Sequence, residues 1–436
     1  MERARKSSKK HHNVLDDKQN VDRLSALPDG VISHILSFLP TQLSVKTSIL
    51  ATRWRFMWAR VPVLDLEGVY GSSQTTSFPG IVCTVMLRHK AVSLNTFRLS
   101  YMIPDGPTDD DDGPMSSYEL ETCIATAIER NVKNLDLNLE VELPRCVLTC
   151  KTLVDFRMAG RVTLPCRGPI SLSSLKKLHF YNVPHEVDLS RLLAGCPVLD
   201  ELTIYQSPGF ELDGCTISSP TLKRLTIKFS SNRVKIYAPA LRYLKVFNCK
   251  YEQISVSLMK SLIEADIYLY AFAESDHRCV LKFLDSLCNV KCLKLSTHYG
   301  KTFSLPVTSS IVKFGSLTKL ELSANWCFLT KFLESADHLR VLIISECHWH
   351  SEHWMDPIGE RCACLFHSLR SVTIYEFQCT EQDFNMVRFV LRNAQVLERM
   401  EISCPREGVD LKKKFDAIQR ISLFRRGSKE CELAFS

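Results

Sequence analysis

The sequence predicts an α/β protein in which a short helical segment precedes a long solenoid of parallel strands. Two observations support this fold class. Residues 22–58 carry apolar side chains at helical spacing. From about residue 120, a short pattern of the form apolar-x-x-apolar-x-apolar then recurs towards the end of the chain. The 436 residues allow two or three domains or one elongated array.

Composition narrows the classes of protein that come into question. Hydrophobic residues make up 45% of the chain and charged residues 24%, as in an ordinary soluble protein. No apolar run approaches the ~18 residues of a membrane helix, and residues 1–20 lack the apolar core of a secretory signal. We therefore expect a protein of the nucleus and/or cytoplasm with no membrane partner. A net charge of +7 is too small to suggest a nucleic-acid partner.

Residues 22–58 are predicted to form three short amphipathic helices. Pro28 stands at the opening of the first, where its missing N–H is no loss. Pro40 ends that helix, Thr41 can cap the second, and Thr52 opens the third. So much apolar surface in about forty residues is more than so small a unit can bury. A partner is therefore implied.

The sequences LPDGVISHILSFLP, VKTSILATRWRFMW and VPVLDLE together resemble an F-box of the plant F-box/leucine-rich-repeat type. The resemblance implies docking on a Skp-type adaptor, which bridges to a cullin and a RING protein in an SCF ubiquitin ligase. It assigns this docking to Leu27, Pro28, Ile32, Leu36, Leu39 and Pro40, with Val45, Leu50 and Trp54 in support. One departure, Ala51-Thr52 where members often have Ser-Lys, changes a surface charge. The alternative is a helical cap on the domain behind it.

The recurring pattern occurs at intervals of about 19 to 30 residues, the range of leucine-rich repeats. Each copy describes a short strand whose apolar residues point inward, and one repeat alone buries too little to be stable. Stacking into a curved, irregular solenoid is the physical solution, with short outer helices expected at residues 188–195 and 332–336. The apolar triads are Val132-Leu135-Leu137, Leu153-Phe156-Met158, Leu175-Leu178-Phe180, Leu199-Leu202-Ile204, Leu222-Leu225-Ile227, Leu241-Leu244-Val246, Leu262-Ala265-Ile267, Val290-Leu293-Leu295, Leu317-Leu320-Leu322, Leu339-Leu342-Ile344, Leu369-Val372-Ile374 and Leu397-Met400-Ile402.

Between the F-box and the repeats, residues 61–68 are predicted to form a strand and residues 69–80 a loop. A helix and a strand built around Phe97 and Leu99 should follow. Residues 104–117 are rich in Pro, Gly and Asp and are predicted to be a mobile acidic loop. Its four consecutive aspartates lack the ligand spacing of an EF-hand, which favours a solvated loop over a calcium site.

The tail carries a second resemblance. FNMVRFVLRNAQVLERMEISC, a following basic segment and a final apolar strand are similar to the FBD domain that closes many plant F-box/leucine-rich-repeat proteins. Gly427-Ser428 stands where members often have Ala-Ser. Such a domain would cap the open end of the solenoid. The predicted organisation is a basic disordered tail at 1–20, with nuclear localisation as the alternative, an F-box at 21–60, the solenoid at 61–354 and the FBD domain at 355–436.

The sequence shows no signature of catalysis. It lacks a Gly-x-Ser-x-Gly elbow, a P-loop, a dinucleotide fingerprint and H-E-x-x-H, so we expect a non-catalytic protein without a cofactor. Eighteen cysteines form no C-x-x-C, which excludes the usual RING and zinc-ribbon spacings. A cluster of histidines and cysteines at residues 347–367 could bind zinc. Its spacing fits no common module, so no metal site is predicted.

The strand residues between the inward positions should line the concave face. Stacked strands should align Tyr181, Tyr205, Phe247 and Tyr268 into a partly aromatic column beside basic residues. Such a combination is typical of protein-binding surfaces and suits acidic motifs. A solvated face is the alternative, because a register error of one residue exchanges inside and outside. The candidate target-binding residues are Lys177, Tyr181, Tyr205, Arg224, Lys228, Tyr243, Lys245, Phe247 and Tyr268, and His179 is among the other positions assigned outward.

These predictions together describe the substrate-recognition subunit of an SCF-type ubiquitin ligase, in which partner subunits transfer ubiquitin to an unknown target protein. Two alternatives stay open. One is a scaffold that binds the adaptor without any target depending on it. The other is a sensor whose solenoid encloses a small acidic ligand, which a deep basic pocket would favour.

Overall fold

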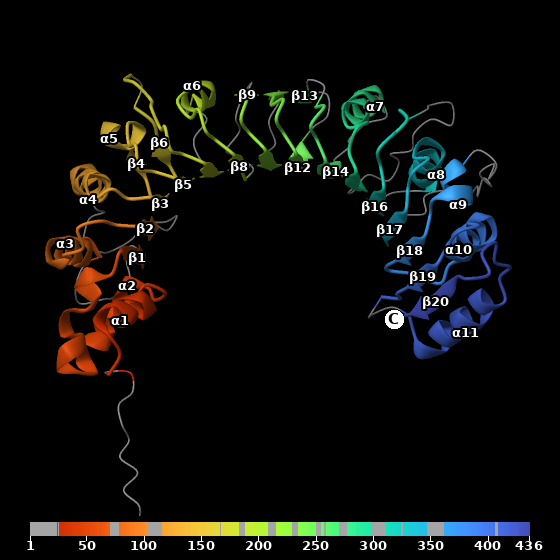
Figure 1. Cartoon of the computed structure of the whole chain (residues 1–436), viewed down its shortest axis with the longest axis horizontal. Coiled ribbons are helices and arrows are strands. Elements are labelled where there is room, and N and C mark those ends of the chain that lie inside the picture. The colour runs from red at the N-terminus through yellow and green to blue at the C-terminus, as the bar shows by residue number, and fades with distance from the viewer. Residues whose placement is uncertain are drawn as a thin grey trace, which may run out of the picture.

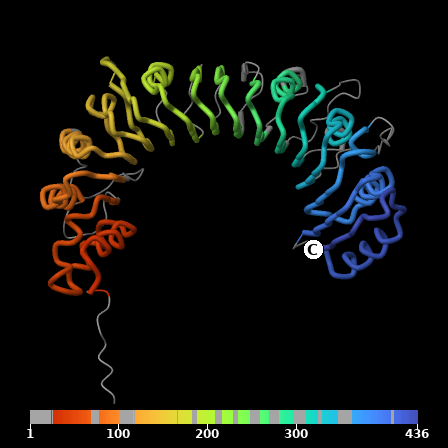
Figure 2. Tube along the Cα trace, viewed as in Figure 1, coloured from red at the N-terminus to blue at the C-terminus, as the bar shows by residue number. Residues whose placement is uncertain are grey.

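The structure is a computed structural model that describes residue 24 and residues 26–69, 78–102, 116–165, 167–182, 188–207, 215–228, 234–249, 254–256, 259–269, 277–297, 311–323, 326–346, 362–405 and 409–436. These residues form an open arch (Figure 1). Parallel strands line its inner face, and helices and turns cover its outer face. The chain winds from the outer rim to an inner strand and back, once per repeat (Figure 2).

The N-terminal end of the arch is helical. It consists of α1 (Asp29–Leu36), α2 (Thr41–Lys46) and the 3₁₀ segments η1 (Thr47–Ile49), η2 (Thr52–Phe56) and η3 (Trp58–Arg60). The expected third helix begins at Thr52, as predicted, but it is a short 3₁₀ helix and not an α-helix. Aromatic residues lose side-chain freedom in an α-helix, and short 3₁₀ turns are common connectors between packed elements.

Pro28 stands at the opening of the first helix, as predicted, whereas Pro40 and Thr41 act differently from the prediction. Pro28 and Pro40 adopt extended backbone as the residues before α1 and α2. Thr41 is the first residue of α2, and its Oγ1 accepts a hydrogen bond from the backbone N–H of Asp65 at 2.8 Å. The expected capping role of Thr41 was therefore wrong. Its side chain instead ties the helical segment to the first strand of the sheet.

The inner face is one parallel sheet that, within the described residues, holds fifteen strands in sequence order. Neighbouring strands pair without a change of direction from one end of the arch to the other. The strands are β1 (Val63–Val69), β2 (Thr96–Met102), β3 (Asn134–Asn138), β5 (Asp155–Ala159), β7 (Lys177–Tyr181), β8 (Glu201–Tyr205), β10 (Arg224–Lys228), β12 (Tyr243–Cys249), β14 (Glu264–Leu269), β15 (Cys292–Thr297), β16 (Lys319–Ser323), β17 (Val341–Glu346), β18 (Ser371–Ile374), β19 (Arg399–Ile402) and β20 (Glu432–Phe435).

The outer side carries the connections. Two short parallel sheets lie there, one of β4 (Val141–Glu142) and β6 (Val162–Thr163), the other of β9 (Cys215–Ser218), β11 (Val234–Tyr237) and β13 (Ile254–Val256). The helices are α3 (Phe78–Arg88), α4 (Ser117–Glu129), α5 (Arg145–Leu148), α6 (Leu189–Ala194), α7 (His277–Ser286), α8 (Trp326–Ser335), α9 (Ala363–His367), α10 (Glu381–Asn393) and α11 (Leu411–Ser422).

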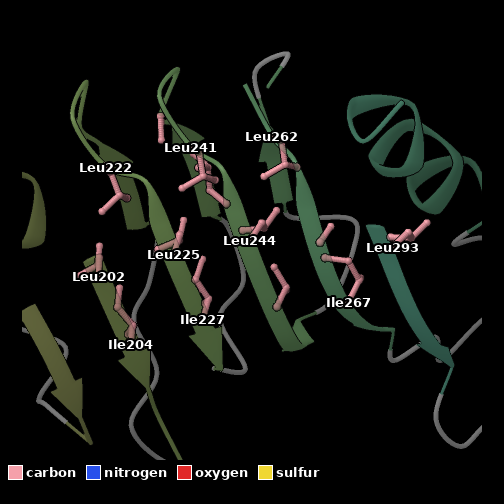
Figure 3. Packing of buried hydrophobic residues seen from close by; sticks show 14 of the residues in the cluster. Leu202, Ile204, Leu222, Leu225, Ile227, Leu241, Leu244, Leu262, Ile267 and Leu293 are labelled. Atoms are coloured by element: carbon pink, nitrogen blue, oxygen red, sulfur yellow. The ribbon is translucent and has the colours of Figure 1, made fainter. Parts of the chain in front are cut away.

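All twelve predicted repeats are confirmed. The second and third members of every triad lie on a strand of the inner sheet, and no member exposes more than 3% of its surface. Leu202, Leu225 and Leu244 occupy equivalent positions on paired strands, and Figure 3 shows them stacked between the sheet and the outer turns. One apolar core therefore continues through the solenoid.

The connecting segments agree in part with the expectations. The outer helices expected at 188–195 and 332–336 are confirmed as α6 and as part of α8. Of the expected loop at 69–80, residues 70–77 lie outside the described residues, and Phe78 to Gly80 instead begin α3. Most of the acidic loop expected at 104–117 and the basic tail at 1–20 lie outside them as well. Ser116 and Glu119 form a capping box that begins α4.

A buried histidine holds the helical segment against the solenoid. The Nε2 of His89 lies 2.8 Å from the carbonyl oxygen of Val61, and its Nδ1 lies 3.1 Å from the Arg130 guanidinium. These partners suit a neutral ring that donates through Nε2 and accepts through Nδ1. Burial lowers the pKa of His89, the bond to Val61 opposes this shift, and the charge of Arg130 adds to it.

This lowered pKa predicts a stability that decreases in mild acid. As the pH falls below about 6.5, an unfolded histidine takes up a proton that folded His89 does not, so the free energy of unfolding decreases. We expect the thermal midpoint, followed by circular dichroism from pH 7.5 to 5.5, to fall more steeply for the wild type than for His89→Gln. The exposed His34→Gln variant is the control and should keep the wild-type slope. An equal slope for His89→Gln would contradict this account.

Candidate functional site

Three of the expected adaptor contacts form the small core of the helical segment. Ile32 and Leu36 are fully buried, and Trp54 exposes only 6% of its surface. They pack with Met57 and Val61. In this structure the three side chains lie beneath the surface of the segment. Because they are buried, they do not contact an adaptor directly. Among the other expected contacts, Leu27, Leu39 and Val45 are half-buried, and Pro28, Pro40 and Leu50 are exposed.

A second set of apolar side chains faces solvent instead. Val31, Ile35 and Phe38 follow one another at helical spacing, offset from the buried Ile32 and Leu36. We call the whole set the F-box face, namely Val31, Ile35, Phe38, Leu43, Ile49, Leu50 and Phe56, whose exposed fractions run from 37% for Ile35 to 87% for Ile49. So many exposed apolar residues within one short segment indicate a protein-interaction surface.

Sequence reasoning missed six of these seven residues and named only Leu50. The sequence did contain a signal for these residues, because apolar residues at i and i+4 cover two faces of the first helix and not only one. Without packing partners, however, the sequence does not say which face turns inward.

The surroundings of the F-box face are basic. Lys46, Arg55 and Arg60 are exposed. Arg53 pairs with Asp29 at 2.6 Å, which links η2 to the start of α1. An apolar centre beside cations fits a partner with an apolar groove and an acidic edge.

The concave face contains a row of aromatic rings, which we call the aromatic row. Parallel pairing brings Tyr181 of β7 beside Tyr205 of β8, with ring centroids 5.7 Å apart. Phe247 of β12 and Tyr268 of β14 stack at 4.4 Å. The strand between the two pairs, β10, contributes Lys228, and Tyr205 and Phe247 lie 6.5 Å apart across it. The sequence had predicted this alignment of side chains.

The cations beside the aromatic row differ in their partners. Lys177 lies 3.7 Å from Glu201, and Lys245 lies 2.7 Å from Asp266. Burial by itself lowers the pKa of Lys245, but the hydrogen bond and charge of Asp266 outweigh burial and raise this pKa.

Arg224 and Lys228 of β10 face rings instead. The Arg224 guanidinium lies 4.2 Å from the centre of Tyr243, and the Lys228 ammonium 6.0 Å from that of Tyr205. Neither forms an ion pair with a described carboxylate, so β10 presents two cations free to meet an acidic group.

His179 was expected among the outward residues of the concave face. It occupies the middle position of β7 but exposes only 7% of its surface, because its neighbours cover it. Its Nε2 lies 3.6 Å from Asp155, and burial lowers the pKa of the imidazole in spite of this carboxylate. His179 is therefore a buried residue of β7, two positions before Tyr181, and not part of an exposed binding surface.

The thiols and imidazoles at residues 347–367 are only partly described. Cys347 and its neighbouring histidines lie outside the described residues. Cys362 and Cys364 are buried, and burial raises the pKa of each thiol to about 12. The Cys364 thiol donates to the carbonyl of Leu333 at 3.3 Å. These two cysteines fill the core, whereas His367 is exposed.

The described part of the chain contains no group of three or more His, Cys, Asp or Glu side chains that could hold a metal ion. No helix there is long and apolar enough to cross a membrane.

Comparison with known families agrees with this architecture. Residues 120–266 match the family of leucine-rich repeats of the FBD-associated F-box protein At5g56370, and residues 359–402 match the FBD family. The first match covers strands β3 to β12, the first residues of β14 and, within the aromatic row, Tyr181, Tyr205 and Phe247. The second covers α9, α10 and the strands β18 and β19.

Curated relatives match over most of their length, and all three of the following come from Arabidopsis thaliana. The F-box/FBD/LRR-repeat protein At3g52680 is 28% identical over 95% of this chain and 93% of its own. The F-box/FBD/LRR-repeat protein At1g51370 is 30% identical over 88% of this chain and 89% of its own. The F-box/LRR-repeat protein At4g14103 is 32% identical over 76% of this chain and 93% of its own. The chain therefore belongs to the family of plant F-box/FBD/LRR-repeat proteins.

Proposed function

We propose that this protein is the substrate-recognition subunit of an SCF-type ubiquitin ligase. In this proposal the F-box face binds a Skp-type adaptor, which brings the cullin and RING subunits, and the aromatic row binds a target protein. The observation that carries the proposal is the exposed F-box face, whose apolar side chains, such as Phe38 at 75% and Ile49 at 87%, lie open to solvent. Leaving them exposed forgoes stabilisation that a partner would supply.

The chain needs no catalytic residue for this role. Holding a target lysine near a charged conjugating enzyme raises its effective concentration, and proximity alone then accelerates transfer. Such a mechanism requires a firm link between the two binding surfaces. Thr41, His89 and the pairing of β1 with β2 supply that link at the F-box end. The proposal includes a place of action in the nucleus and/or cytoplasm.

Adaptor binding should depend on the exposed side chains of the F-box face. We expect the double variant Phe38→Ser/Ile49→Ser to bind a purified Skp-type adaptor about 1000-fold more weakly than the wild type, because truncation of central interface anchors costs about 2 kcal/mol or more each. Calorimetric titration of the full chain measures this loss.

The matched control is Leu87→Ser/Val92→Ser, which alters two equally exposed apolar residues, at 86% and 92%, outside the F-box face. It should bind the adaptor as the wild type does. Thermal unfolding of both double variants checks that each stays folded. Wild-type affinity for Phe38→Ser/Ile49→Ser, or failure of the wild type to bind, would contradict the proposal and leave the segment as a helical cap.

Target recognition should depend on the aromatic row. The wild type and Phe38→Ser/Ile49→Ser are expressed in separate cells. We call the target set those proteins whose ubiquitination rises in cells with the wild type but not in cells with this variant. We expect Tyr205→Ser/Phe247→Ser to keep the adaptor and to lose this set, because both rings flank Lys228 at the centre of the row. The measurement is quantitative mass spectrometry of ubiquitinated peptides.

Tyr375→Ser provides the control, since Tyr375 is 47% exposed and follows β18, away from the row. It should leave the target set unchanged. An unchanged set for Tyr205→Ser/Phe247→Ser would contradict target binding at the row. If the wild type binds the adaptor but raises the ubiquitination of no protein, the result would support a scaffold instead.

A further inference from the structure

A basic hollow lies on the edge of the arch where the chain turns into strands β15 to β18. Its volume is about 520 Å³, within the range of small-molecule sites. Among the nine lining residues that the structure describes, five are basic, namely Lys291, Arg340, Arg370, His338 and His367, and none is acidic. We call it the edge pocket. Neither the F-box face nor the aromatic row includes any of its residues.

Repeat geometry brings the cations of the edge pocket together. Lys291, Thr318, Arg340 and Arg370 each stand immediately before a strand, so they occupy equivalent positions in successive repeats. Backbone bonds link them in order, from Thr318 N to Lys291 O at 2.9 Å, Arg340 N to Thr318 O at 2.8 Å and Arg370 N to Arg340 O at 2.9 Å. Adjacent strands lie about 4.8 Å apart. Arg340 and Arg370 are thus neighbours, with Lys291 about two strand spacings from Arg340.

The nearby carboxylates do not neutralise these cations fully. Asp337 pairs with Lys313 at 2.9 Å, and Glu398 pairs with Arg370. Lys291 and Arg340 form no ion pair with any carboxylate in the described ranges. Like charges stacked along one edge repel each other, and a bound anion would relieve this repulsion.

Two hydrogen bonds from hydroxyl groups to backbone carbonyls hold the walls of the edge pocket. The Thr318 hydroxyl donates to the carbonyl of Lys291 at 3.1 Å, and the Ser368 hydroxyl donates to that of Asp337 at 3.0 Å. The imidazoles of His338 and His367 and the hydroxyl of Ser316 also line the pocket and can donate hydrogen bonds to a ligand beside the cations. Guanidinium groups match the oxygens of phosphate in bidentate geometry.

We propose that the edge pocket binds a small anion carrying two or more phosphate groups. Its cations span several strand spacings, further than one phosphate group reaches, and its volume holds a short chain of phosphates. Lys291, Thr318 and Arg340 belong to the repeats, whereas His367 and Arg370 belong to the segment that matches the FBD family. A ligand would therefore bridge the solenoid and its C-terminal cap and stabilise their junction.

Tripolyphosphate is the probe for a test on the full chain. We expect it to bind the wild type by calorimetric titration, with weaker binding at higher salt, and to raise the thermal midpoint. Lys291→Gln and Arg340→Gln should each weaken binding by about tenfold or more. Arg242→Gln is the matched control, because Arg242 holds the equivalent position before β12 and is exposed outside the pocket. It should bind within about twofold of the wild type.

Thermal unfolding without the probe shows whether each variant is folded. Three results would overturn the proposal. The first is no binding of tripolyphosphate to the folded wild type. The second is equal weakening by Arg242→Gln, which would show a diffuse charge effect. The third is tighter binding of a phosphoserine peptide than of tripolyphosphate, which would point to a phosphorylated protein as the ligand.

Discussion

The structure depends on one constraint, that a single repeat cannot bury its own apolar side chains. Leu225 is fully buried only because Leu202 and Leu244 lie beside it on the neighbouring strands. The same relation passes from strand to strand, from Leu64 of β1 to Leu433 of β20. Burying a large aliphatic side chain contributes about 1.5–3 kcal/mol, so every repeat is stabilised by its neighbours. The arch therefore folds as a stack, and the helical F-box and the C-terminal cap cover its ends.

This stacking also determines where functional groups can gather. Side chains alternate along each strand, so residues at one register position form a column across the arch. The column at the end of the strands holds the aromatic row, Tyr181, Tyr205, Phe247 and Tyr268, with Lys228 between its two pairs of rings. The column just before the strands holds Lys291 and Arg340 of the edge pocket. One repeat pattern thus places two chemically different surfaces on a single backbone.

The sequence correctly predicted which side chains form columns across the sheet. It did not predict which apolar side chains of the F-box are buried and which are exposed. Strand register follows from a period of two, so the apolar triads were enough to place Tyr205 beside Tyr181. His179 shared the expected position, but its burial depends on the size of neighbouring side chains, which register does not reveal. In the F-box, apolar residues occupy two faces of α1. Only tertiary packing decides that Ile32 is buried and Val31 exposed.

The edge pocket was not predicted, because its residues come from turns of unequal length. Lys291 and Arg370 are 79 positions apart in the sequence, and no local motif connects them. The parallel ladder brings them to one edge. Sequence reasoning could have found this column by applying the register argument to the residue before each strand as well as to the residues within it.

The measurement that tests the central claim most directly is hydrogen exchange of the full chain, alone and with a Skp-type adaptor. The account predicts that the adaptor slows amide exchange in residues 29–60 and leaves strands β7 to β14 unchanged, because the F-box face binds the adaptor while the aromatic row stays open for a target. Protection of β7 to β14 by the adaptor, or no protection of residues 29–60, would contradict it.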